Sequence, residues 1–434
     1  MGKVQSIASA DSASQSAAST NYLAIGCSDT FSAAVENQAQ LKFNVAGVLS
    51  NMWSRVRQNG TTTASTVTSR KNAADGNQTF SISAGATGTF TDTTHTDSIV
   101  ATDAIAVKVV VGATSTLATA DLAMIFAATT NTVTPLQYNY FQTSVGPASV
   151  TSYLPIGGSN NNVTNNTTEA NAKVRQRKAG TYQAATIHIG TNGRSTATTF
   201  KSRKNGVDGT MTVSIASGAG SIGFFSDTTH TDTIAAGDDY NLSTVTGTGT
   251  GALNVDTTYI EFSSTNSDSI NVCADHNLRT QNISLTRNQA LGGLLTNTGT
   301  TELDVEVIAN VAFTYSELTI NVTTNTVTAA STLTLRANAA AAGLVSASVT
   351  ANGTGVFSDS THTYVAAATD LMDTRLVTGG TGTSLKTNAI MVWANAPSSG
   401  QNITKTLTET IAITDSAARL AAKTRLSGAF PTYL

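Results

Sequence analysis

The residues best suited to chemistry lie in one short motif that recurs three times along the chain. An aspartate is followed three positions later by a histidine and, in the first two copies, five positions later by a second aspartate. The copies are Asp92, His95 and Asp97; Asp227, His230 and Asp232; and Asp359 with His362. Carboxylate and imidazole groups can bind a metal ion together.

Two features of this motif favour a structural role over a metal site. The third copy has Tyr364 where the second aspartate would stand, and oxygen-rich calcium sites draw on more carboxylates than the motif offers. An aspartate followed by threonines is also typical of an Asx-turn, in which the carboxylate accepts backbone N–H groups. We predict turns at these positions and expect no cofactor, with a metal site as the less favoured alternative.

No other set of residues indicates catalysis. Serine and threonine are so abundant that nearness to a histidine says nothing about a hydrolase triad, whose three side chains must meet. The sequence contains no Gly-x-Ser-x-Gly elbow, P-loop, HExxH motif or paired CxxC. A motif present in every copy is better explained by folding than by chemistry, so we expect a protein that is not an enzyme.

The motif belongs to a longer repeat with a period of about 133 residues. Several residue types recur with it, and we predict that they fix turns or an interface. They are Glu36, Glu169 and Glu302; Arg70, Arg203 and Arg336; Asn72, Asn205 and Asn338; Gly76, Gly209 and Gly343; and Phe90, Phe225 and Phe357. A period this long suits a whole domain duplicated in tandem.

We therefore predict three tandem domains between two arms. The predicted segments are an N-terminal arm at 1–20, β-sandwiches at 21–134, 135–268 and 269–398, and a C-terminal arm at 399–434. The first 20 residues contain one lysine and no apolar run, which does not match a secretory signal. We expect neighbouring subunits to hold this arm in place.

The second copy gives the clearest indication of fold class. Short β-branched and aromatic runs alternate with Gly, Asn and Asp at intervals typical of a sandwich or barrel. Strands are predicted at 172–177, 184–189, 198–203 and 211–215, and a turn at 227–232. Apolar and polar residues alternate along 211–215, as in a half-buried strand. The sequence predicts an all-β protein of antiparallel sandwiches.

The order of these signals resembles the C1q/TNF-like jelly roll, which occurs in phage and bacterial surface proteins. The resemblance depends on three short stretches of the middle copy: Ala179-Gly180-Thr181-Tyr182, Arg203-Lys204-Asn205-Gly206 and Ala235-Ala236-Gly237-Asp238. It implies jelly-roll sandwiches that associate with one another, a trimer being one such arrangement.

Composition excludes some classes of partner. Charged residues make up 12% of the chain against a typical ~25%, and the net charge is −3. No basic surface for nucleic acid is expected, and the basic cluster at 173–178 is predicted to be a solvated strand face. The longest apolar run, 123–128, is too short to cross a bilayer, so no membrane insertion is expected.

The C-terminal arm alternates like a strand without a partner in its own domain, with apolar residues at Ile403, Leu407, Ile411 and Ile413. An unpaired strand needs backbone partners elsewhere. We predict that this arm adds to a sheet edge of a neighbouring subunit.

Together these features predict a non-enzymatic, self-assembling virion protein: a phage capsid, capsid-decoration, head-fibre or tail component. Its partners would be copies of itself and other virion subunits. Two alternatives stay open. One is an extracellular filament or surface-layer subunit. The other is an adhesin that binds a surface glycan through Tyr138, Tyr140 and Tyr153, since jelly rolls also occur in lectins.

Overall fold

The described part of the chain belongs to one compact unit. A computed structural model describes residues 4–10, 14–25, 34–129, 134–156, 167–264, 269–275, 279–291, 301–302, 305–309 and 311–395. These residues all lie in the unit Met1–Ala396, and the remaining unit, Pro397–Leu434, lies outside them. The predicted boundaries between sandwiches do not appear as breaks in this unit, so they stay predictions.

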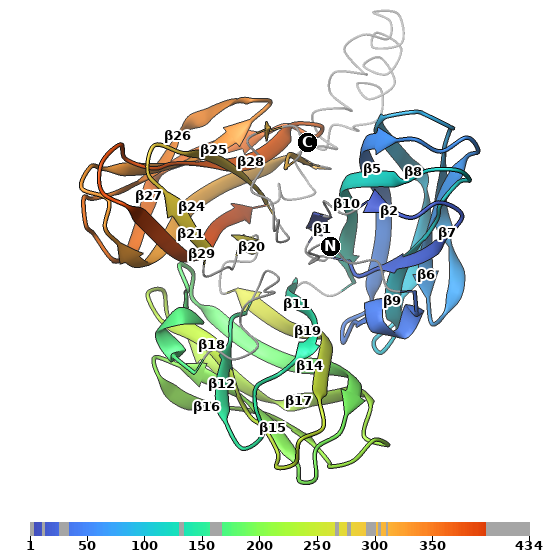
Figure 1. Ribbon diagram of the computed structural model, residues 1–434, viewed down its shortest axis with the longest axis horizontal. Helices are drawn as coiled ribbons and strands as arrows, with labels where there is room; N and C mark the ends of the chain where they lie inside the picture. The colour runs from blue at the N-terminus through green and yellow to red at the C-terminus, as the bar shows by residue number, and fades with distance from the viewer. Residues whose placement is uncertain are drawn as a thin grey trace, which may run out of the picture. The chain divides into compact units, whose positions relative to one another are not determined.

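The described chain is built of antiparallel β-strands in six sheets. The sheets form three equivalent pairs, which we call repeats 1, 2 and 3; they are drawn in blue, green and orange in Figure 1. The predicted all-β class of jelly-roll sandwiches is therefore confirmed.

Repeat 1 contains the strands β1 to β10 and a 3₁₀ turn, η1. The strands are β1 (Val4–Ala10), β2 (Ser14–Gln15), β3 (Thr20–Leu23), β4 (Leu41–Lys42), β5 (Gly47–Asn59), β6 (Ser65–Lys71), β7 (Ala74–Ile82), β8 (Gly88–Ile99), β9 (Ala104–Val110) and β10 (Leu117–Ala128). The turn η1 spans Glu36–Ala39.

Repeat 2 contains the strands β11 to β19 and a 3₁₀ turn, η2. The strands are β11 (Thr134–Ser144), β12 (Thr151–Leu154), β13 (Val174–Arg175), β14 (Gly180–Asn192), β15 (Thr198–Lys204), β16 (Val207–Ile215), β17 (Gly223–Ile234), β18 (Asp239–Val245) and β19 (Leu253–Ser264). The turn η2 spans Glu169–Asn171.

Repeat 3 contains the strands β20 to β29. They are β20 (Ser269–Asp275), β21 (Arg279–Asn282), β22 (Thr286–Ala290), β23 (Val307–Ile308), β24 (Phe313–Asn325), β25 (Ser331–Ala337), β26 (Ala340–Val349), β27 (Gly355–Ala366), β28 (Leu371–Val377) and β29 (Ser384–Asn395).

The strand order within each repeat is that of a jelly roll. In repeat 1 the first sheet has the order β1-β10-β5-β8 and the second sheet β3-β9-β6-β7. Repeat 2 follows with β11-β19-β14-β17 and β12-β18-β15-β16, and repeat 3 with β20-β29-β24-β27 and β22-β28-β25-β26. Eight main strands in two sheets, with the first strand beside the last, make a double Greek key.

The core of each repeat lies between its two sheets because apolar residues alternate along the strands. On β16, Met211, Val213 and Ile215 are buried, while Ser214 between them is exposed. The side-chain period of two in a strand sends these apolar residues to one face. Burying such side chains supplies about 1.5–3 kcal/mol each, which stabilises the sandwich.

Three sequence expectations differ from the structure. The strand expected at 172–177 shrinks to β13, because a turn occupies the preceding residues. Residues 227–232 lie within strand β17 rather than in a turn between strands. Residues 4–10 form β1, which pairs with β10 of the same chain instead of extending toward a neighbour.

Candidate functional site

The Asp-Thr-Thr-His motif forms a bulge inside the edge strand of each first sheet. In repeat 2, Gln183 pairs with Thr231 and Ala185 with Asp227, so three residues of β17 lie opposite Ala184 alone. In the same way, three residues of the edge strand lie opposite Asn51 in repeat 1 and opposite Glu317 in repeat 3. These three opposing residues all have positive φ, between 51° and 56°. The bulge therefore forces a left-handed residue into the neighbouring strand.

The first aspartate of the motif joins the two sheets of its repeat. Asp92 accepts a hydrogen bond from the backbone N–H of Thr79 on β7 at 2.8 Å, and β7 is an outer strand of the second sheet. It also accepts from the N–H groups of Thr94 and His95 at 3.0 and 3.1 Å, which is Asx geometry. The carboxylate thus satisfies an edge N–H that would otherwise be open to strand pairing.

The other repeats use the same bonds. Asp227 accepts from the N–H of Thr212 at 2.8 Å, and Asp359 accepts from the N–H of Ser346 at 2.9 Å. Although burial favours the neutral acid, backbone donors lower the pKa of Asp227 to about 2, and they lower the pKa values of Asp92 and Asp359 as well. All three carboxylates are ionised at neutral pH.

The histidine of each motif contacts its own aspartate and the hydroxyl of the preceding threonine. In all three repeats the ring Nδ1 lies 2.9 Å from the carboxylate Oδ2. About half of each histidine side chain is exposed, from 46% at His362 to 59% at His230. Each histidine therefore screens one side of the carboxylate that fixes the bulge.

The second aspartate is occupied by other protein donors. Asp97 accepts from Ser69 Oγ at 2.6 Å and from Gln78 Nε2 at 3.1 Å, and Asp232 accepts from the Tyr240 hydroxyl at 2.8 Å. Within the described ranges, no group of three or more His, Cys, Asp or Glu side chains is arranged to hold a metal ion. The two aspartates of a motif therefore act at separate places in the sandwich.

The glycine of the repeat makes room for that second aspartate. A Cβ atom at Gly209 would lie 2.3 Å from Ser202 Oγ and 2.6 Å from Asp232 Oδ2, and Gly76 is equally crowded by Ser69 and Asp97. Repeat 3 replaces this polar set by an apolar one, with Leu335 and Ala342 buried and Tyr364 in place of the aspartate.

Gly343 does not have the same role as Gly76 and Gly209, with which the sequence prediction groups it. Arg203 pairs with Asp208 and Lys201 with Thr212, whereas in repeat 3 the corresponding pairs are Arg336 with Ala341 and Thr334 with Ser346. Repeat 3 therefore has one more residue here. Gly343 takes a φ of 59° to accommodate the extra residue, so it is not a simple counterpart of Gly76 and Gly209.

The repeated arginine fastens a remote turn to the hairpin between the fourth and fifth main strands. Arg70 donates to both carboxylate oxygens of Glu36, at 3.1 and 2.7 Å, and also bonds Asp75 and the carbonyl of Ala73. Arg203 does the same with Glu169, and Arg336 with Glu302. A bidentate arginine–carboxylate pair fixes geometry as well as charge.

The repeated asparagine and phenylalanine complete the same frame. Asn72, Asn205 and Asn338 have positive φ and donate to Asp103, Asp238 and Asp370 at 2.6 to 2.8 Å. Phe90, Phe225 and Phe357 are half-buried and pack against the hydrophobic cores. These landmarks therefore hold turns and strands of the fold in place.

Contacts between repeats occur at the residue opposite the bulge. Asn44 of repeat 1 donates to the carbonyl of Ala184 at 3.1 Å and to Thr186 Oγ1 at 2.8 Å. One period later, Arg177 of repeat 2 bonds Glu317 of repeat 3 at 3.2 Å, and Lys178 lies 3.5 Å from the same carboxylate. The predicted solvated basic face is thus wrong for Arg177 and Lys178, which join two repeats.

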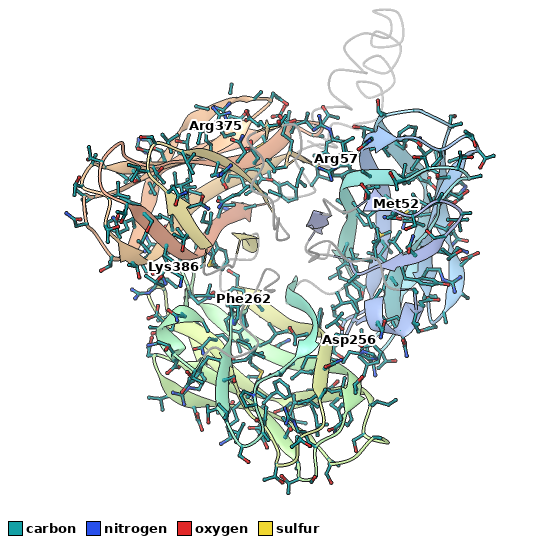
Figure 2. The ribbon with its side chains drawn as sticks, in the orientation of Figure 1. Met52, Arg57, Asp256, Phe262, Arg375 and Lys386 are labelled. Atoms are coloured by element: carbon teal, nitrogen blue, oxygen red, sulfur yellow. The ribbon has the colours of Figure 1, made fainter. Side chains whose placement is uncertain are left out.

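Further contacts link the same surfaces. Phe43 of repeat 1 packs against Tyr259 of repeat 2 with ring centroids 5.8 Å apart, and Phe262, labelled in Figure 2, packs edge-on against Trp393 of repeat 3 at 5.7 Å. Arg55 of repeat 1 pairs with Glu306 of repeat 3 at 2.8 Å, with the Glu306 side chain only 2% exposed. Each repeat therefore contacts both of the others.

A buried acidic group lies close to the last of these contacts. Asp373 on β28 is fully buried. Neither of its carboxylate oxygens accepts a hydrogen bond from a neighbouring N–H or O–H group of the described residues. Burial first, and then the negative charge of Glu302, raises the pKa of Asp373 well above 3.8. Glu302 itself is held ionised by Arg336. Repeat 2 has Asn241 at the position of Asp373.

A second buried pair lies in repeat 2 and was not found from the sequence. His188 Nδ1 lies 3.0 Å from Asp256 Oδ2, and their side chains are 4% and 1% exposed. Burial raises the pKa of Asp256. The next residue, Thr257, donates to the carbonyl of Gln40 in repeat 1 at 2.8 Å. The pair is therefore buried next to the Thr257 contact between repeats 1 and 2.

The tyrosines predicted to bind a glycan lie on β11 and β12 of repeat 2. Tyr153 lies beneath the guanidinium of Arg203, 5.7 Å from its carbon, so it is not an open aromatic platform. Tyr138 and Tyr140 are in β11. The arm residues Ile403, Leu407, Ile411 and Ile413 lie outside the described residues. In the part of the chain that is described, no helix has the length and hydropathy needed to cross a membrane.

No family model and no curated protein matches the chain, so the resemblance to the C1q/TNF family stays an expectation. Among the solved structures that match is one described as "The Triple Jelly Roll Fold and Turret Assembly in an Archaeal Virus", which covers 90% of this chain and 91% of its own, with 12% identity and a TM-score of 0.18.

Proposed function

We propose that this protein is a non-enzymatic structural subunit of a virus particle, which assembles with copies of itself. One observation carries the proposal: equivalent surfaces join successive jelly rolls, through Asn44 and Ala184 between repeats 1 and 2, and through Arg177 and Glu317 between repeats 2 and 3. A contact that uses different surfaces on its two sides can be repeated from unit to unit, as shells, rings and fibres require.

The use of the titratable side chains supports a structural role. The aspartates of the bulge bind backbone N–H groups of their own repeat, the arginines hold glutamates at remote turns, and the pair His188–Asp256 is buried. These groups are engaged in holding strands and repeats together.

The proposed mechanism is geometric. Each jelly roll buries its own core, the inter-repeat contacts hold three jelly rolls in one subunit, and the segment 399–434 joins subunits to one another. Capsid, capsid-decoration, head-fibre and tail components all fit this scheme, with a bacteriophage as the proposed virus and the virion as the location.

Electron microscopy and sedimentation of the purified protein test this proposal. We expect ordered assemblies that specific antibodies also label on virions. A chain truncated after residue 401 is expected to keep its β-rich circular dichroism spectrum and to lose assembly. A full-length protein that remains a monomer at high concentration, and that antibodies do not detect on virions, contradicts the proposal.

A further inference from the structure

The outer face of each second sheet carries a row of four side chains that lie far apart in the sequence of their repeat. In repeat 1 the row crosses four strands: Thr20 lies opposite Val110, Val110 opposite Thr66, and Thr66 opposite Ser81. All four side chains are exposed, and Val110 retains 40% of its surface. The core side of the same strands is lined by other residues, so this row is not needed to fill the core.

The other two repeats have the same four residue types in the same register. In repeat 2 the row is Thr151, Val245, Thr199 and Ser214. In repeat 3 the row is Thr286, Val377, Thr332 and Ser348. Val245 and Val377 are 48% and 44% exposed. An uncharged Thr–Val–Thr–Ser row therefore occurs three times in one chain.

Folding alone does not explain this identity. One row further along the same sheets, Tyr22 pairs with Lys108 in repeat 1, Tyr153 with Ser243 in repeat 2, and Asn288 with Arg375 in repeat 3; Arg375 is labelled in Figure 2. The residues of this neighbouring row therefore differ between the repeats, and Ser243 and Asn288 are buried in it, at 4% and 1% exposed. The row that stays unchanged is the exposed one, which favours a contact shared by all three repeats.

We infer that each Thr–Val–Thr–Ser row docks against the same row of a second copy of this chain. The inference rests on the proposed function and names the surface through which subunits meet. A row without charge can face its own kind without repulsion or a buried unpaired charge. Threonine and serine hydroxyls both donate and accept hydrogen bonds, so like hydroxyls can pair across the contact.

Rotation by a two-fold axis brings two such rows together as an isologous contact, in which the same patch is used on both sides. One row is smaller than the roughly 800 Å² per partner of a stable interface, so a single contact is weak. A chain with three rows can contact three other copies, and contacts that act together give the avidity that an assembly needs.

The test uses the full-length protein with a charge placed at the centre of each row. In one variant, V110E/V245E/V377E, like charges meet wherever two rows meet, and we expect the concentration needed for assembly to rise about tenfold or more. The second variant is V110K/V245K/V377K. On its own it is expected to show the same rise in the concentration needed for assembly. An equimolar mixture of the two places glutamate against lysine and is expected to restore assembly.

A matched control carries the same added charge at other exposed valines. Val100, Val207 and Val365 are 60%, 68% and 69% exposed and lie outside the rows, so V100E/V207E/V365E is expected to assemble like the unmodified chain. Circular dichroism and thermal unfolding check that every variant is folded.

The outcomes separate this inference from the proposed function. If the unmodified chain assembles and the row variant assembles equally well, the inference is wrong and the proposed function stands. The inference is also wrong if the control variant loses assembly as much as the row variant, or if the mixture of the glutamate and lysine variants does not restore assembly. If the unmodified chain fails to assemble, the proposed function fails first.

Discussion

Asn44 reaches from one jelly roll to the carbonyl of Ala184 in the next, at 3.1 Å, and Ala184 is the left-handed residue opposite the three-residue bulge of β17. The same bulge contains Asp227, which ties the two sheets of repeat 2 together. A single local irregularity therefore serves both the inside of a jelly roll and its junction with the preceding one.

Removing the carboxylate of the bulge should weaken the fold. In the variant Asp227→Ala, the N–H groups of Thr212, Thr229 and His230 lose their acceptor. We expect a loss of about 2 kcal/mol in the free energy of unfolding, because bonds to a charged acceptor contribute 1.5–3 kcal/mol. Urea denaturation measures this, with Asp208→Ala as the control, whose half-exposed carboxylate pairs with Lys201 and Arg203. Equal effects at both positions contradict the role given to the bulge.

Acid should act through the same group. The pKa of Asp227 is about 2 in the folded protein against 3.8 ordinarily, so its stabilising effect is complete above 3.8 and is lost as the pH falls toward 2. We expect the melting temperature to drop over this window. The variant Asp227→Asn should show a shallower drop, which differential scanning calorimetry at pH 2 to 5 can measure. Curves of equal slope would exclude Asp227 as a contributor.

Asp373 should have the opposite dependence on pH. Its pKa is raised in the folded protein, so the stabilising state is the protonated one, and stability falls as the pH rises above 3.8 until the raised pKa is passed. The variant Asp373→Asn should remove this slope and be more stable at pH 8. The reciprocal variant Asn241→Asp in repeat 2 should introduce such a slope. Chemical denaturation from pH 5 to 10 tests both, and unchanged slopes would refute the assignment.

Crowding at Gly209 predicts a steric effect. The variant Gly209→Ala places a methyl group against Ser202 and Asp232, and overpacking of this kind costs about 1–3 kcal/mol. Gly220 is a matched control, since no atom lies within 4 Å of a Cβ there. Thermal unfolding of the two alanine variants gives the comparison, and a Gly209→Ala protein as stable as the Gly220→Ala protein would disprove the crowding.

The junction of repeats 2 and 3 can be measured by a double-mutant cycle. Arg177 and Glu317 form a partly buried ion pair, with side chains 24% and 15% exposed. We expect Arg177→Met and Glu317→Gln to be coupled by about 1 kcal/mol, at the upper end for surface pairs. The exposed pair Lys201–Asp208 should give a smaller coupling. A coupling near zero for Arg177 and Glu317 would show that the pair does not join the repeats energetically.

The fold class follows from the sequence because the determining signal is local. Alternation along 211–215, together with the Asn-Gly and Asp-Gly dipeptides near Arg203, predicts strands and turns without knowledge of distant residues. The jelly-roll order does not follow in this way. β1 pairs with β10, more than a hundred residues later, and no local pattern specifies such a pairing.

The roles of the repeated residues were only partly predictable for the same reason. The period brings Arg70 and Glu36 to notice, but not the bond between them across 34 residues. The row that contains Thr20, Thr66 and Val110 is scattered along the sequence and becomes visible only through the strand register. His188 and Asp256 have no counterparts in a motif, so no sequence signal pointed to their pairing.

The contacts at the bulge also bear on the history of the gene. An amide meets a backbone carbonyl where repeats 1 and 2 join, whereas an arginine and a lysine meet a glutamate where repeats 2 and 3 join. If repeats 1 and 2 changed places, Arg177 would face Asn51 instead of Glu317, and Glu317 would lose its cationic partners. Once identical duplicates have diverged at the residues where they meet, recombination can no longer change the order of the repeats without removing these contacts.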